Sequence, residues 1–173
     1  MKIPIVIVDR DGQVLLGPGA YGHDDPRLRR AQAAAPEEVT VSVASSLIVP
    51  KIIGQASVAE SRLERNDVGG TLRQVALAIE DARSVDEVRR LEATAAAYYF
   101  DAWTDHPFVV PRFTKAEAKR IPAHWSRYDG RRSLLGKGNS NRKGERPTNC
   151  VLNLLYALAA VEVRLACLSV GLD

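Results

Sequence analysis

Cysteine is scarce in this sequence, with two in 173 residues, and long uninterrupted apolar runs are missing. Cys150 and Cys167 fall in one expected helix at a spacing that suits neither a disulfide nor a metal pair, so we expect core residues of a reduced protein. The longest apolar candidate, Val151 to Val163, is interrupted by an asparagine and a glutamate, and the N-terminal apolar run is too short for a signal peptide. These absences predict a cytoplasmic protein without a membrane partner.

The composition is otherwise ordinary, with 46% hydrophobic and 26% charged residues, which is typical of a globular protein. A chain of this length can form one domain with a core, or one domain and a fragment of another. No internal repeat is evident, so the sequence does not predict a repeat architecture.

Basic residues are concentrated between Arg112 and Arg146. This stretch holds eleven Lys and Arg and three acids, a net charge of +8, whereas the rest of the chain carries −5. Such a segment indicates a polyanionic partner, most often nucleic acid, and the alternative is a solvated loop without a partner. Trp125 and Tyr128 are possible base-stacking groups. The candidate DNA-backbone contacts are Arg127, Arg131, Arg132, Lys137, Arg142, Lys143 and Arg146.

The expected fold is mostly α-helical. A β-branched run from Ile3 to Val8, a turn with Asp-Gly and residues 13–16 predict a hairpin, which we interpret as the remnant of a larger sheet. The last helix is apolar on most of its circumference, which predicts burial within a helical domain. Residues 128–149 are expected to form an open loop. Helices are predicted over 27–35, 37–65 with a kink at Pro50, 68–82, 84–103, 114 to just before Pro122, and 147–170, with capping boxes at Ser84 and Thr114 and a C-cap at Gly171.

Glu92 interrupts the apolar stripe of the predicted helix over 84–103. At the helical period this stripe comprises Val85, Val88, Glu92, Ala95, Ala96, Tyr99 and Trp103. A carboxylate on a core-facing stripe needs a cation, a hydrogen-bond network or a raised pKa. A divalent metal such as Mg²⁺ or Mn²⁺ is one solution, and a salt bridge to Arg89, three residues back, is the other. Small residues from Ala93 to Ala96 would let another helix approach closely.

Several segments, in the same order, resemble the CRISPR spacer-acquisition endonuclease/integrase family. They are Arg30-Ala31-Gln32, Lys51 to Gln55, Leu91 to Phe100, Arg146 to Leu158, and Glu162 to Asp173. The resemblance implies a metal-dependent DNA endonuclease/integrase in which Glu92 is a catalytic ligand to Mg²⁺ or Mn²⁺. It also implies double-stranded DNA (spacer precursor and CRISPR repeat), a homodimer, and a small CRISPR-associated adaptation partner protein.

The family pattern also predicts the domain organisation. Residues 1–22 are expected to be a remnant of an N-terminal β-domain, and residues 23–173 a C-terminal-type helical catalytic domain that is incomplete at its C-terminus. The family's histidine and aspartate ligands are expected beyond Asp173, so this truncated chain is expected to be inactive alone. His23, His106 and His124 are expected to be ordinary surface or loop residues. The alternatives are a non-catalytic helical DNA-binding or scaffold protein, and an unrelated bundle with Glu92 in a plain salt bridge.

Overall fold

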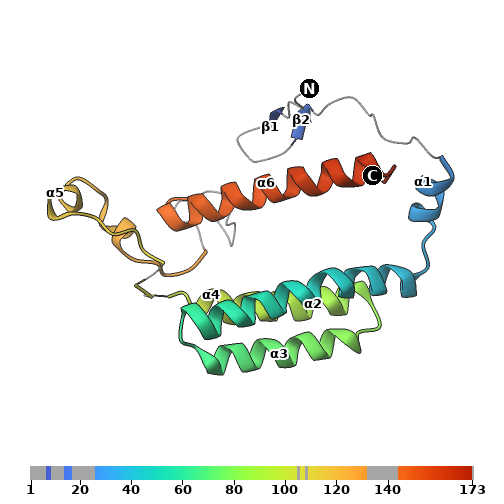
Figure 1. Cartoon of the computed structure of the whole chain (residues 1–173), viewed down its shortest axis with the longest axis horizontal. Coiled ribbons are helices and arrows are strands. Elements are labelled where there is room, and N and C mark those ends of the chain that lie inside the picture. Colours follow the sequence, from blue (N-terminus) through green and yellow to red (C-terminus); the bar gives the residue numbers. More distant parts are fainter. Residues whose placement is uncertain are drawn as a thin grey trace. The chain divides into compact units, whose positions relative to one another are not determined.

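The computed structural model describes residues 7–8, 14–16, 26–104, 106–107, 109–131 and 144–172. This part of the chain is mostly α-helical, as predicted (Figure 1). The chain forms two compact units, one made of Pro36–Arg131 and the other of Met1–Ala35 with Arg132–Asp173. The predicted domain boundary between residues 22 and 23 stays a prediction.

The unit Pro36–Arg131 is built on three helices that pack side by side, α2 (Glu37–Arg62), α3 (Asn66–Glu80) and α4 (Val85–Asp101) (Figure 1). The predicted helices over 37–65, 68–82 and 84–103 are confirmed, with ends that shift by up to three residues. Acidic residues in the first turn of each helix favour these starts through the helix dipole. The helix α2 continues through the exposed Pro50.

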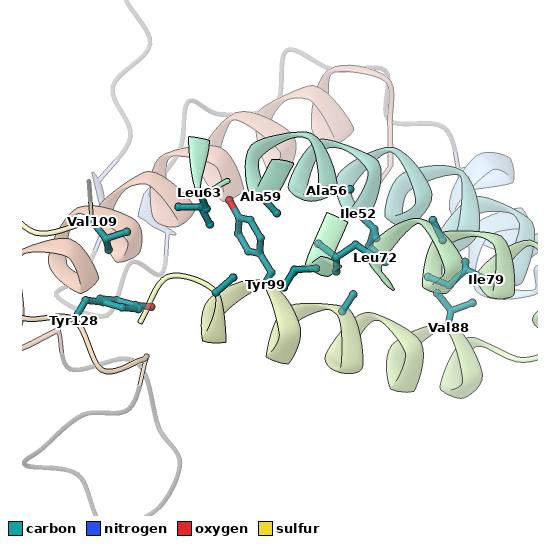
Figure 2. Close-up of a cluster of buried hydrophobic side chains, with 14 of the residues drawn as sticks. Ile52, Ala56, Ala59, Leu63, Leu72, Ile79, Val88, Tyr99, Val109 and Tyr128 are labelled. Carbon is teal, nitrogen blue, oxygen red and sulfur yellow. The ribbon is translucent and has the colours of Figure 1, made fainter. Parts of the chain in front are cut away.

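Buried apolar side chains from all three helices fill the space between them (Figure 2). They recur at three- and four-residue spacings, so each helix presents one stripe to the other two. The principal members are Ile52, Ala56 and Ala59 from α2, Leu72, Ala76 and Ile79 from α3, and Val88, Ala95 and Tyr99 from α4. Each large apolar side chain buried in this way contributes about 1.5–3 kcal/mol. The core therefore fixes which residues of α2 and α4 lie opposite one another.

The turn between α2 and α3 places a side-chain-bearing residue in the left-handed region. Glu64 has φ +55° and follows the last residues of α2. The amide of Arg65 donates to the carbonyl of Ala59 at 2.9 Å, and the amide of Leu63 donates to the carbonyl of Val58 at 3.3 Å. Both bonds close the C-terminal end of α2, where glycine is the usual residue at a left-handed position. Glu64 therefore carries a backbone strain that glycine would not.

A glycine of α3 makes room for an ion pair between α2 and α3. The Arg73 guanidinium donates to both oxygens of Glu60, Nε to Oε1 at 3.0 Å and Nη2 to Oε2 at 2.8 Å. The bonds from Arg73 hold the pKa of Glu60 below its ordinary value. A Cβ atom at Gly69 would lie only 2.3 Å from Cγ of Glu60, whereas one at Gly70 would meet nothing within 4 Å. Gly69 is thus required by the position of Glu60.

Both predicted helix caps are present. Ser84 Oγ accepts the amide of Glu87 at 3.1 Å at the start of α4, but the Glu87 carboxylate accepts the amide of Arg83 at 3.0 Å, not that of Ser84. The box at Thr114 is complete and starts the short helix α5 (Lys115–Ala118). Its bonds from Thr114 lower the pKa of Glu117. A 3-10 helix, η1 (Ala123–Ser126), follows and was not predicted.

The second unit contains the paired strands β1 (Ile7–Val8) and β2 (Val14–Leu16) and the helices α1 (Pro26–Ala33) and α6 (Pro147–Ser169). The strands are antiparallel, with Ile7 opposite Leu16. The other residues of the predicted hairpin lie outside the described residues, and its interpretation as a sheet remnant stays a prediction. Gly171 has φ +84° just after α6, as expected of its C-cap.

The prediction that α6 is buried is wrong for the chain as the structure describes it. Six large apolar side chains of this helix are 48–61% exposed, namely Val151, Leu154, Leu155, Tyr156, Leu158 and Val163. An apolar circumference predicts burial, but the pattern does not specify which polypeptide supplies the cover. The prediction of a core position is also wrong for Cys150, which is exposed, and Cys167 is half-buried.

By length and composition alone, two of the described helices could cross a membrane. They are α2 (Glu37–Arg62) and the segment Pro147–Cys167 of α6, with mean hydropathies of 1.4 and 1.7. The expectation that no apolar stretch reaches this length is wrong by that measure. The indication is weak, because a core helix of a soluble protein passes the same test, and α2 places four buried residues in the bundle core.

Alanine substitutions at Gly69 and Gly70 should have different effects on stability. Gly70→Ala should raise the free energy of unfolding by about 0.8–1 kcal/mol through helix propensity. Gly69→Ala should lose most of that gain, because its methyl group displaces the Glu60 side chain from Arg73. Urea unfolding of both variants measures the difference. In a Glu60→Ala background the two substitutions should become equivalent, and equal gains in the wild-type background would contradict the packing described.

Replacing Glu64 by glycine should stabilise the chain. Glycine adopts the left-handed conformation without the penalty of a Cβ atom but loses more entropy on folding, which leaves a net gain of about 0.5–1 kcal/mol. Thermal and urea unfolding test this gain. Glu64→Ala is the matched control, since it removes the carboxylate and keeps the Cβ atom. A gain of the same size for alanine would show that the charge, not the backbone conformation, is unfavourable.

Candidate functional site

Glu92 lies on α4 at the edge of the helix's buried stripe. Val88, Ala95 and Tyr99 are buried, as the predicted stripe requires, and Ala96 is half-buried beside them. The side chain of Glu92 is 31% exposed, so the carboxylate borders the core without entering it. The expected cost of burying this charge is therefore smaller than a core-facing position would imply.

The cation beside Glu92 comes from another helix. The Lys51 ammonium of α2 forms a salt bridge and hydrogen bond with Oε1 of Glu92. Lys51 directly precedes the fully buried Ile52, so the core packing of α2 against α4 carries its side chain to this edge. The salt bridge expected as the alternative to a metal is therefore present, but its partner is Lys51 and not Arg89. Arg89 contacts Asp86 at 3.4 Å, one turn earlier on the exposed side of α4.

Sequence reasoning missed Lys51 as the partner of Glu92. Residues 41 positions apart are not related by helical spacing, and only the packing of α2 on α4 brings them together. The family-like segment from Lys51 to Gln55 was the one available signal, because it contains the lysine.

A divalent metal at Glu92 would need further ligands. Mg²⁺ and Mn²⁺ prefer hard oxygen donors, and the partly exposed carboxylate of Glu92 is such a donor. Among the residues that the structure describes, no three His, Cys, Asp or Glu side chains come close enough to hold a metal ion. The described residues thus fit one ligand of the three-ligand centre that the resemblance implies, and not a complete centre.

Three of the seven predicted DNA contacts fall on described residues. Arg127 is exposed, and the half-buried Arg131 places its guanidinium 5.2 Å from the centre of the Phe100 ring on α4. Arg146 is only 3% exposed. The structure therefore places Arg127 at the surface and uses Arg131 partly as a packing group on the bundle. The remaining four, Arg132, Lys137, Arg142 and Lys143, lie outside the described residues.

The expected stacking role of Tyr128 is contradicted by its position. Tyr128 is 1% exposed and belongs to the buried cluster drawn in Figure 2. Its ring centre lies 6.1 Å from that of Trp103. Trp103 in turn contacts Tyr99 and Phe100 with ring centres 5.4 and 5.8 Å away. This aromatic cluster attaches the segment after α4 to the bundle, so Tyr128 serves the core. Trp125 in η1 is half-buried and stays a candidate.

The histidines do not add to the site in the described part of the chain. His106 and His124 are half-buried and belong to no group of three potential metal ligands among the residues described. His23 lies outside them.

Comparisons with known proteins cover the whole chain. The model of the family described as CRISPR associated protein Cas1 matches residues 1–173. The chain is 31% identical over 191 aligned positions to CRISPR-associated endonuclease Cas1 2 of Rhodospirillum rubrum, covering 99% of this chain and 48% of that protein.

A solved structure described as a partial Cas6-RT-Cas1–Cas2 complex shares the fold. The TM-score is 0.62 at 18% sequence identity, over 99% of this chain and 47% of that one. The chain therefore spans about half the length of the relatives it matches. Since the family model matches every residue of it, the chain belongs to the Cas1 family.

Proposed function

We propose that this chain is part of a metal-dependent DNA endonuclease/integrase of CRISPR adaptation, which inserts spacer DNA into the repeat array, and that the chain is inactive alone. The observation that carries the proposal is the family match over residues 1–173, combined with a glutamate at the family-like position on α4. Glu92 is only partly buried there, so a metal can reach its carboxylate from solvent.

Glu92 is the proposed catalytic residue, as one ligand of Mg²⁺ or Mn²⁺. When bound, such a metal polarises a scissile phosphate and stabilises charge on the attacking and leaving oxygens. Within this chain, the packing of α2 on α4 and the contact with Lys51 hold the Glu92 carboxylate, a hard oxygen donor, in a fixed place. The other ligands would come from outside the described residues.

The basic segment is the proposed contact to double-stranded DNA, both the spacer precursor and the CRISPR repeat. Lys and Arg contacts to phosphates supply affinity without reading sequence, which suits an enzyme that accepts varied spacers. Among its described residues, Arg112, Lys115, Lys119, Arg120 and Arg127 are exposed. These side chains therefore lie at the surface, where a polyanion can reach them.

The proposed setting is a cytoplasmic homodimer with a small Cas2-type adaptation partner. A structure with this fold belongs to a complex described as containing Cas1 and Cas2, which supports a partner of that kind. In this proposal β1 and β2 are the remnant of an N-terminal β-domain, and residues 23–173 belong to the helical catalytic domain.

A second candidate is a non-catalytic helical protein that binds DNA or acts as a scaffold. It is favoured by one observation, the lack of a complete set of metal ligands among the described residues. The basic segment is common to both candidates. They differ in whether spacer acquisition requires the Glu92 carboxylate.

DNA binding by the chain should depend steeply on salt and on the basic segment. The triple variant Arg127→Gln, Arg142→Gln, Lys143→Gln should bind duplex DNA more weakly. The slope of log affinity against log salt should fall by about one for each phosphate that the variant no longer neutralises. Fluorescence anisotropy at several salt concentrations measures the slope.

The matched control removes three exposed arginines of the bundle, in the variant Arg62→Gln, Arg83→Gln, Arg90→Gln. It lowers the net charge equally and should leave the slope near the wild-type value. Equal slopes for the two triple variants would mean that net charge alone, not the basic segment, governs binding.

Spacer acquisition in the host cell should require the Glu92 carboxylate. Glu92→Gln in the encoding gene should abolish the appearance of new spacers, as measured by sequencing the CRISPR array, because an amide is a poor replacement for an anionic metal ligand. Glu60→Gln is the matched control, since that side chain is 30% exposed and also ion-paired on the same bundle. Normal acquisition with Glu92→Gln would favour the non-catalytic candidate.

A further inference from the structure

The two half-buried glutamates of the bundle meet different kinds of cation. Glu60 and Glu92 have side chains that are 30% and 31% exposed, so their access to water is equal. Arg73 donates one hydrogen bond to each oxygen of Glu60. Glu92 receives only the Lys51 ammonium, at Oε1, among the contacts that the structure describes. The difference lies in the chemistry of the partner and not in burial.

The chemistry of the two partners suggests two different purposes. A guanidinium is a rigid fork that matches both carboxylate oxygens and holds them in one geometry. An ammonium is a compact point charge on a flexible four-carbon stem and engages one oxygen at a time. The Glu60–Arg73 pair therefore has a structural role, because both carboxylate oxygens are already bonded. The Glu92–Lys51 pair leaves one carboxylate oxygen without a described donor and holds the other by an exchangeable contact.

The Lys51 side chain can also move away from Glu92 into solvent. Its side chain is 39% exposed and its stem starts on the solvent-bordering edge of α2, so the ammonium can turn into water without disturbing the buried Ile52 next to it. Two cations repel each other when they share one carboxylate. A metal ion and the Lys51 ammonium are thus competitors for Glu92.

We propose that Lys51 is a positioning residue for Glu92. In the absence of a divalent cation, the Lys51 ammonium occupies the position beside the carboxylate that the cation would take. Lys51 keeps the carboxylate at the α2–α4 edge, and a divalent ion binds Glu92 by displacing it. The inference rests on the proposed function, because it takes Glu92 to be a metal ligand. It assigns to Lys51 a role that a purely structural salt bridge does not have.

Paramagnetic broadening by Mn²⁺ tests the proposal on the isotope-labelled chain. Mn²⁺ is titrated while the amide signals next to Glu92 and next to Glu60 are followed in the same spectra. Lys51→Met should raise the apparent Mn²⁺ affinity at Glu92 by about 1.5- to 5-fold, the factor that an exposed ion pair represents. Lys51→Arg should lower it, because a guanidinium can engage both carboxylate oxygens. Neither change should alter the signals next to Glu60.

Two controls make the result specific. Arg73→Met removes a cation from the other pair and should leave the broadening at Glu92 unchanged. Glu92→Gln should abolish the broadening next to position 92 in every background. Lys51→Met retains the apolar stem, and circular dichroism of each variant verifies that the helices are intact.

The outcomes separate this proposal from the proposed function. Mn²⁺ affinity at Glu92 that is equal or lower in Lys51→Met overturns the role of Lys51 while Glu92 remains a ligand. Broadening that is no greater at Glu92 than at Glu60 in all variants overturns the exchange proposed for this chain, whereas the proposed function is decided separately by spacer acquisition with Glu92→Gln. Tighter binding in Lys51→Met together with weaker binding in Lys51→Arg supports the exchange of one cation for the other.

Discussion

The packing of α2, α3 and α4 around one apolar core is the constraint on which the rest of this unit depends. Ile52 and Ala56 on α2 and Val88 and Ala95 on α4 are almost completely buried. Their burial sets the rotation of each helix, and that rotation brings the side chains at the helix edges together. Lys51 and Glu92 are 41 positions apart and meet because their neighbours on the same helices are held in the core.

The same packing explains how polar groups are accommodated at the edges of the bundle. Gly69 leaves the space in which Glu60 reaches Arg73, so one pair is fixed by backbone and fork geometry together. Among the described residues, Glu92 receives a single contact, from the Lys51 ammonium at Oε1. One carboxylate thus serves the fold, and the contrast supports the proposal that the other binds a metal.

Much of the fold could be predicted from the sequence, because local signals determine it. Ser84 and Thr114 sit three residues before glutamates, and these patterns gave the starts of α4 and α5. The apolar stripe around Glu92 was also correct. The partner of Glu92 could not be predicted, since helical spacing suggests only neighbours such as Arg89, and the true partner depends on how two helices pack.

Other errors have the same physical origin. Tyr128 belongs to a basic, glycine-rich segment that is typical of a binding loop, but its ring is buried against Trp103. The apolar circumference of α6 predicted burial, and the side chains from Val151 to Val163 remain largely exposed in the described chain. Sequence patterns indicate whether a side chain favours burial or solvent, whereas tertiary packing determines which residues it contacts.

The central claim is that Glu92 is a metal ligand that exchanges its Lys51 contact for a divalent ion. Anomalous scattering from Mn²⁺ in crystals of the protein grown with the metal tests it most directly. An anomalous peak at bonding distance from the Glu92 carboxylate, with the Lys51 ammonium turned away, is the predicted result. Crystals with Mn²⁺ bound elsewhere and the Lys51–Glu92 pair intact would contradict it.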